Sequence, residues 1–179
     1  MALHRYDALV DLIADRMPAC GSTKVVAVDG RSGSGKTAFT AGLVAATGAA
    51  VLHLDDIYPG WHGLAATPPM VAGVLASVAV GEVGVAPRWS WVRDEPASEL
   101  RVPPAPLLVL DGVGSGATVL RPYLSLLIWL DAPADVRRSR ALARDGDTFA
   151  PYWDIWAEQE ETYLAADHPR QHADVVIPT

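Results

Sequence analysis

The eight residues from Gly30 to Thr37 constrain this chain more than any other stretch. They fit G-x-x-x-x-G-K-[ST], the pattern of a phosphate-binding loop, or P-loop. An apolar run at 24–29 precedes them and a helix-like segment at 38–46 follows, which is the strand–loop–helix order that the motif requires. Glycines let such a loop turn tightly, so that successive N–H groups and a helix N-terminus face an anion. The sequence therefore predicts a site for a nucleoside triphosphate.

Two side chains of this loop have predicted roles in holding ATP and Mg²⁺, the expected cofactors. Lys36 would reach the β- and γ-phosphates, and the Thr37 hydroxyl would hold Mg²⁺. The chain has 12 arginines but only two lysines, so one of its two lysines falls where the motif needs it. The nucleotide-binding residues are predicted to be Gly30, Arg31, Ser32, Gly33, Ser34, Gly35, Lys36 and Thr37.

Composition limits the class of protein. A chain of 179 residues, half of them hydrophobic, can bury one α/β core and is short for two. The net charge of −7 argues against a nucleic-acid partner, and no apolar run is long enough for a membrane helix. A single cysteine excludes an internal disulfide, and the charged residues near the N-terminus are unlike a secretory signal. We expect a cytoplasmic protein without a membrane partner; its oligomeric state stays open.

Apolar and helical segments alternate along the chain. A lead-in segment, 1–21, has helical spacing over 3–17, and residues 81–106 are expected to form loops or a hairpin for the substrate. A lid is expected at 134–150, helical to 144 and then a mobile-looking loop at 145–147. The pattern predicts a single α/β domain over 1–179, with a parallel sheet of about five strands flanked by helices. The expected strands are 24–29, 51–54, 107–110, 125–130 and 174–177, and the other helices are 69–80 and 151–166.

Aspartates end several of the predicted strands, and ligands of open parallel sheets bind beyond those ends. Asp29 and Asp131 are interpreted as caps of strand-to-helix turns. Asp111 follows four apolar residues and precedes Gly112, the Walker-B layout, in which a carboxylate holds Mg²⁺. We therefore predict Asp111 as a second metal anchor beside Thr37.

Asp55 and Asp56 follow the second strand and bear on the type of reaction. Phosphoryl transfer to a hydroxyl needs a group that accepts its proton, which a carboxylate can do. An acceptor that is already a phosphate would instead be bound by arginines and repelled by carboxylates. The pair therefore favours an alcohol acceptor, such as a sugar or nucleoside hydroxyl, although a solvated turn is the alternative.

Arginines and tryptophans complete the set of candidates. Arg137, Arg140 and Arg144 share one face of the predicted lid helix, where they would stabilise charge on a transferring phosphoryl group or simply face solvent. Aromatic rings in the loops on the acceptor side could stack on a base or a sugar, with plain packing as the alternative. These rings belong to Trp61, Trp89 and Trp91.

Taken together, these motifs resemble the uridine kinase-like family of P-loop kinases. The resemblance is carried by 24–37, by the segment 54–58 (Leu-Asp-Asp-Ile-Tyr), by 110–112 (Leu-Asp-Gly) and by the arginines of 137–144. It implies that an aspartate acts near the acceptor hydroxyl and the metal, beside a tyrosine on the substrate side. It also implies a Walker-B carboxylate and lid arginines. The matching residues are Asp55, Tyr58, Asp111, Arg140 and Arg144.

Two departures from that family concern the acceptor. Ile57 stands where the family has phenylalanine, and 89–91 (Trp-Ser-Trp) lacks the aspartate of the family's substrate hairpin. The sequence thus predicts ATP- and Mg²⁺-dependent phosphoryl transfer to a hydroxyl of a small molecule, for which a nucleoside is one example. A nucleotide monophosphate kinase and an ATP-hydrolysing regulatory switch stay as alternatives. Guanine recognition by N-K-x-D is excluded because the chain has no asparagine.

Overall fold

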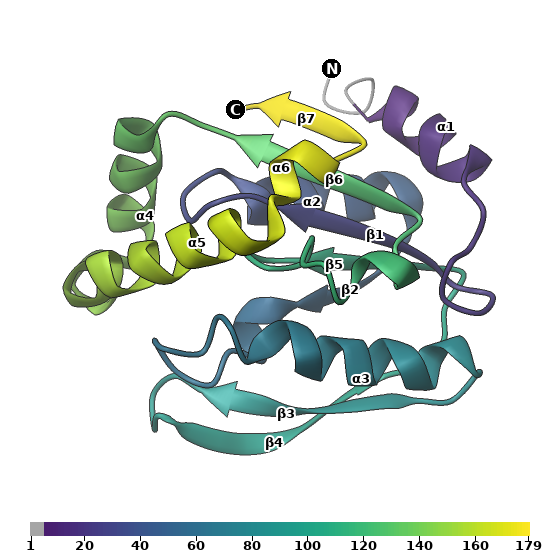
Figure 1. The fold of residues 1–179 in the computed structure, drawn as a ribbon, viewed down its shortest axis with the longest axis horizontal. Helices are drawn as coiled ribbons and strands as arrows, with labels where there is room; N and C mark the ends of the chain where they lie inside the picture. The colour runs from purple at the N-terminus through teal and green to yellow at the C-terminus, as the bar shows by residue number, and fades with distance from the viewer. Residues whose placement is uncertain (1–5) are drawn as a thin grey trace.

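The computed structural model describes residues 6–179, apart from the side chains of 142 and 144–148. Its centre is a parallel sheet of five strands in the order β2-β5-β1-β6-β7 (Figure 1). A separate antiparallel hairpin, β3-β4, lies beyond the β2 edge of the sheet (Figure 1). The strands are β1 Lys24–Asp29, β2 Ala50–His53, β3 Gly84–Ser90, β4 Glu95–Val102, β5 Leu107–Asp111, β6 Leu126–Asp131 and β7 Val175–Pro178.

Helices cover both faces of the sheet (Figure 1). Helices follow β1, β2 and β6 along the chain, and such helical connections return the chain so that strands of the sheet run parallel. Short 3₁₀ turns follow β2 (η2, Leu54–Asp56) and precede α5 (η4, Ala150–Tyr152). The helices are α1 Asp7–Asp15, α2 Lys36–Thr47, α3 Thr67–Ala79, α4 Ala134–Phe149, α5 Trp153–Asp167 and α6 Pro169–His172.

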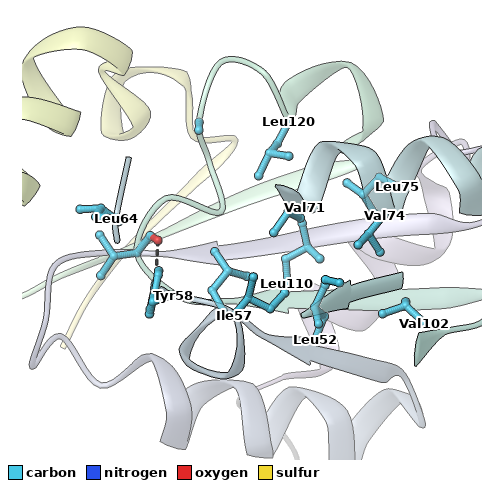
Figure 2. Packing of buried hydrophobic residues seen from close by; sticks show 14 of the residues in the cluster. Leu52, Ile57, Tyr58, Leu64, Val71, Val74, Leu75, Val102, Leu110 and Leu120 are labelled. Carbon is cyan, nitrogen blue, oxygen red and sulfur yellow. Dashed lines mark hydrogen bonds between the residues drawn. The ribbon is translucent and has the colours of Figure 1, made fainter. Parts of the chain in front are cut away.

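Alternating side chains of the strands divide the core into two layers. Val26 and Val28 of β1 pack with residues of α1 and α2, whereas Val25 packs on the other face with residues of α3 and α5. This follows from the period of two along a strand, which turns successive side chains to opposite faces. Figure 2 shows the second layer, in which Leu52 of β2 and Leu110 of β5 lie near side chains of α3.

The predicted fold class is confirmed, with differences at the edges of elements. Residues 81–106 contain the hairpin, and the lead-in helix is observed at 7–15, while 3–5 lie outside the described residues. The loop predicted at 145–147 is wrong, because α4 continues to Phe149. Glycine and aspartate disfavour helix there, but Phe149 is buried against aromatic side chains, and such tertiary packing overrides propensity.

None of the helices in the described part of the chain is both long and apolar enough to cross a bilayer. The hydrophobic residues are instead gathered around the sheet. Among the fully buried ones are Leu43, Leu75, Leu108, Leu120 and Ile128.

We expect Leu75→Ala to lower the free energy of unfolding by about 2–5 kcal/mol, because it removes buried methyl groups and leaves a cavity. Leu75 is fully buried in α3, away from the P-loop. Val92→Ala is the control, since Val92 is 97% exposed, and it should change stability by less than about 0.5 kcal/mol. Urea unfolding followed by circular dichroism measures both; equal stabilities would contradict the packing described for α3.

Candidate functional site

The P-loop joins β1 to α2 and is shaped by glycines in left-handed conformations. Gly33 has φ 80° and Gly35, the N-cap of α2, has φ 89°. A Cβ on Gly33 would also lie 2.1 Å from the carbonyl oxygen of Arg137, so no side chain fits there. α2 starts at Lys36, and the first four N–H groups of a helix have no partner within it. The loop therefore presents free backbone donors at a positive helix end, which suits a phosphate.

Lys36 lies along this loop. Its ammonium group donates hydrogen bonds to the carbonyl oxygens of Gly30, at 2.6 Å, and Arg31, at 3.1 Å. Thr37 follows on the first turn of α2 and is exposed. Both residues line the same cleft, so the charge and the hydroxyl predicted to meet a nucleotide are in place there.

A cleft of about 1290 Å³ lies over the carboxyl ends of β1, β2 and β5. This edge is where ligands bind in open parallel sheets. One part of its wall is the P-loop with the start of α2, and another is the segment after β2 together with the α4–α5 corner. Its lining includes Lys36, Thr37, Asp55, Tyr58, Trp61, Trp91, Asp111 and Arg140.

The end of β1 is fixed by Asp29, whose carboxylate is completely buried. It accepts hydrogen bonds from the backbone N–H groups of Gly30, Gly114 and Gly116, at 2.7, 3.2 and 2.8 Å. The Tyr163 hydroxyl of α5 donates a fourth, at 2.6 Å. Burial raises the pKa of Asp29, while these bonds and the charge of Lys36 act to lower it. Asp29 thus does more than cap a turn: it ties the P-loop to the loop after β5 and to α5.

Asp111 ends β5 and is 4% exposed. Its Oδ2 pairs with Nδ1 of His53 at 2.9 Å, and this hydrogen bond raises the pKa of His53. Its Oδ1 is buried and has no hydrogen-bond partner among the residues that the structure describes. A buried carboxylate oxygen without a donor is suited to a cation. Sequence reasoning missed His53, which the register of β2 against β5 places opposite Asp111.

The two aspartates of the η2 turn point to different places. Asp55 is exposed and lines the cleft, and its backbone carbonyl accepts a hydrogen bond from Nε1 of Trp91 at 2.8 Å. Asp56 pairs instead with Arg88 of the hairpin, at 3.2 Å. The structure therefore brings Asp55 to the cleft and uses the neighbouring carboxylate to hold the hairpin against the turn.

Tyr58 is almost completely buried below the cleft. Its hydroxyl donates to the carbonyl oxygen of Val113 at 2.8 Å (Figure 2). Burial raises its pKa well above the usual value, so the hydroxyl stays protonated. Tyr58 lines the cleft while its hydroxyl is held in the protein, an arrangement that suits shaping the wall.

Aromatic rings from three segments meet beside Asp55. The ring of Trp61 stacks on that of Tyr152, with a centroid distance of 4.5 Å and an interplanar angle of 5°. The ring centroid of Trp91, in the hairpin, lies 4.7 Å from that of Trp61. Gln159 of α5 donates to the carbonyl oxygen of Trp61 at 2.7 Å, fixing its backbone. The ring of Trp89 lies near Gly60 and does not line the cleft, so it is the one predicted tryptophan outside this group.

The predicted lid arginines lie in different surroundings. Arg140 is exposed, lines the cleft and donates to the Thr179 hydroxyl at 3.4 Å. Arg137 is buried and packs against the P-loop, with its backbone next to Gly33. The side chain of Arg144 lies outside the described residues.

Glu160 of α5 is a further residue at the P-loop that the sequence did not reveal. It is 1% exposed and binds the side chain of Arg31 and the backbone N–H of Ser32. The Arg31 guanidinium therefore points to α5, and any contact of Arg31 with a nucleotide would come from its backbone. No local sequence signal marks Glu160, because its partners lie about 130 residues away.

Solved structures of kinases share this fold. A protein from Bacillus stearothermophilus, provisionally assigned as a uridine kinase, has a TM-score of 0.68 and 20% identity over 97% of both chains. A provisionally assigned fructose transport system kinase from Silicibacter sp. TM1040 has a TM-score of 0.60 and 19% identity over 99% of both chains. Shikimate kinase from Acinetobacter baumannii, in complex with shikimate, has a TM-score of 0.50 and 16% identity over 90% of this chain and 86% of its own.

The sequence matches no protein-family model and no curated protein. At these low identities the structural likenesses show the fold alone. It is a P-loop kinase fold, and the Bacillus stearothermophilus protein matches it over 97% of this chain. The resemblance carried by the sequence motifs is confirmed at that level.

We expect Tyr163→Phe to lower the free energy of unfolding by about 1.5–3 kcal/mol, since it removes a donor from a buried carboxylate. Tyr123→Phe, at a partly buried tyrosine, is the matched control and should be nearly neutral. Denaturant unfolding at neutral pH measures both. If the two variants are equally stable, the Tyr163–Asp29 bond does not hold α5 to the end of β1.

Proposed function

We propose that this chain is an ATP- and Mg²⁺-dependent kinase that transfers a phosphoryl group to a hydroxyl of a small molecule. The observation that carries the proposal is that a single cleft is lined by Lys36 and Thr37 of the P-loop and by the carboxylate of Asp55. A phosphate donor and an alcohol acceptor would thus meet in one space. The kinase assignments of the structural neighbours that share the fold support the same reaction class.

At the donor end, the P-loop N–H groups and Lys36 would bind the β- and γ-phosphates. Lys36 would exchange its hydrogen bonds to loop carbonyls for phosphate oxygens. Thr37 and Asp111 would hold Mg²⁺, with Asp55 nearby; bound there, the ion neutralises phosphate charge. No group of three or more acidic, histidine or cysteine side chains suited to a metal exists in the described part of the chain, so phosphate oxygens and water would complete its ligands.

At the acceptor end, Asp55 would orient the hydroxyl and take its proton. The hydroxyl oxygen then bonds to the γ-phosphorus, the bond to the β–γ bridging oxygen breaks, and ADP leaves. Arg140, on the lid helix at the cleft, would offset charge on the transferring group. Asp56, which the sequence also suggested for the substrate, would take no part in this step, because it pairs with Arg88 of the hairpin.

The body of the acceptor would rest against the aromatic wall formed by Trp61, Trp91 and Tyr152, with Tyr58 beneath it. Such a wall suits a molecule with an apolar or flat part, of which a nucleoside is one example. A carboxylate beside this wall disfavours acceptors that already carry phosphate. The proposed partner is therefore a small, unphosphorylated alcohol.

The base of the nucleotide would lie in a smaller cavity of about 340 Å³ at the other side of the P-loop. This cavity shares Gly35, Ala38 and Arg140 with the main cleft, so one ligand could extend through both. Phe39 and Thr179 also line it.

The test is ATP consumption, with Mg²⁺, across panels of nucleosides, nucleoside monophosphates, sugars and vitamin precursors. We expect an unphosphorylated alcohol to stimulate turnover and to appear as its phosphate ester by mass spectrometry. Stimulation by monophosphates alone would instead indicate a nucleotide kinase. ATP hydrolysis that no acceptor stimulates would indicate a nucleotide-dependent switch.

Asp55→Asn should lower kcat by about 10²–10⁴-fold with the best acceptor of that panel, because the amide cannot accept the proton. ATP affinity should change little. Asp56→Asn is the matched control: it should retain most of the turnover, since Asp56 faces Arg88. Steady-state kinetics and calorimetric ATP titration measure both effects; equal turnover of the two variants would remove Asp55 from the reaction.

A further inference from the structure

The backbone N–H and carbonyl oxygen of Ser32, in the middle of the P-loop, are both hydrogen-bonded to side chains of helices α4 and α5. Its N–H donates to Oε1 of Glu160 on α5 at 2.7 Å. Its carbonyl oxygen accepts from Nη1 of Arg137, in the first turn of α4, at 3.3 Å. Two helices that are far from the loop in sequence therefore hold the same residue from either side.

The charges around Ser32 balance. Glu160 pairs with Nε of Arg31 at 3.0 Å, and Arg31 reaches the neighbouring Glu161 with Nη1 at 2.6 Å. Arg137 is close enough to Arg31 for the two cations to affect each other, and burial together with that charge lowers the pKa of Arg137. Two guanidinium groups thus face two carboxylates. An internal ion pair of this kind adds little net stability by itself, so its value lies in the geometry that it fixes.

Gly33, the next residue, is fixed by close packing. Its backbone lies so near the carbonyl of Arg137 that a Cβ would overlap it. The hydrogen bonds on Ser32 and this contact define the position of the first half of the loop against α4 and α5. The second half continues into α2, whose free N–H groups begin beyond Gly35.

Holding Ser32 becomes important when a nucleotide binds. Lys36 donates to the carbonyls of Gly30 and Arg31 in this structure. Those bonds are lost if its ammonium group moves to a phosphate. The contacts of Ser32 use backbone atoms that the Lys36 movement leaves untouched, so they would keep the loop in place.

We propose that Glu160, together with Arg137, is a positioning residue for nucleotide binding. It holds Ser32 so that the N–H groups of Gly33, Gly35, Lys36 and Thr37 already face the phosphate site before the phosphates arrive, while the Ser34 N–H stays bonded to the Arg31 carbonyl at 3.0 Å. Pre-organisation of this kind improves affinity because the ligand does not have to order the loop. The inference rests on the proposed function only in taking the P-loop as the nucleotide site. It concerns how the site is held and is independent of the acceptor.

The test compares Glu160→Ala and Glu160→Gln with Glu161→Gln. Glu161 binds the same arginine, but its side chain is 65% exposed, so it is a matched control. We expect the Kd of ATP with Mg²⁺, measured by calorimetry, to rise at least about tenfold in Glu160→Ala, which loses hydrogen bonds to a charged group. Glu160→Gln keeps an acceptor for Ser32 and should show a rise of about threefold. Glu161→Gln should stay within about twofold.

Amide hydrogen exchange without nucleotide gives a second readout. Glu160→Ala should accelerate exchange at 31–34 while the strands stay protected. Arg137→Met, which removes the hydrogen bond to the Ser32 carbonyl oxygen, should have the same effect. An ATP affinity equal to that of wild type, or unchanged exchange at Ser32, would overturn the proposal, even if the melting temperature falls. If Glu160→Ala does not fold, Glu160→Gln and Arg137→Met decide. Wild-type protein that binds no ATP would refute the proposed function, while exchange at Ser32 would still decide whether Glu160 holds the loop.

Discussion

The buried carboxylate of Asp29 is the interaction on which the arrangement of the site depends. It collects donors from the first residue of the P-loop, from Gly114 and Gly116 after β5, and from Tyr163 of α5. A completely buried carboxylate is costly unless its acceptor positions are filled. Burial of Asp29 therefore favours the arrangement in which all three segments lie together. The ends of β1 and β5 are in this way tied to each other and to α5, the helix that also bears Glu160.

The same residue type has different surroundings at neighbouring strand ends. Asp29 is fully buried and has its donors supplied by the protein. Asp111 is nearly buried, with one oxygen on His53 and the other without a described partner. Asp55 is exposed and lines the cleft, where the proposed acceptor would reach it. Aspartates at neighbouring strand ends thus differ in burial and in the donors that reach them, and the proposed roles follow these differences.

Short-range patterns predicted much of this structure. The P-loop, the five strands and the aspartates that follow them are local features, so the sheet and the position of the cleft could be anticipated. The contacts of Ser32 with Glu160 and Arg137 could not, because they depend on helices more than 100 residues away. His53 became a partner of Asp111 only through the strand order, in which β2 lies beside β5. The end of α4 was missed because packing of Phe149 overrides the local preference.

The parts that would choose the acceptor lie outside the sheet that the chain shares with solved kinase structures. Trp91 comes from the β3-β4 hairpin, Trp61 from the segment after β2, and Tyr152 from the α4–α5 corner. Structures with this fold include a shikimate kinase and proteins provisionally assigned as a uridine kinase and a fructose transport system kinase. A fold fixes where phosphate binds, and its attached segments fix what receives it. Because the rings of Trp91 and Tyr152 both pack on Trp61, a change at Trp61 would affect the positions of the other two. Acceptor specificity here should therefore depend on the group as a whole.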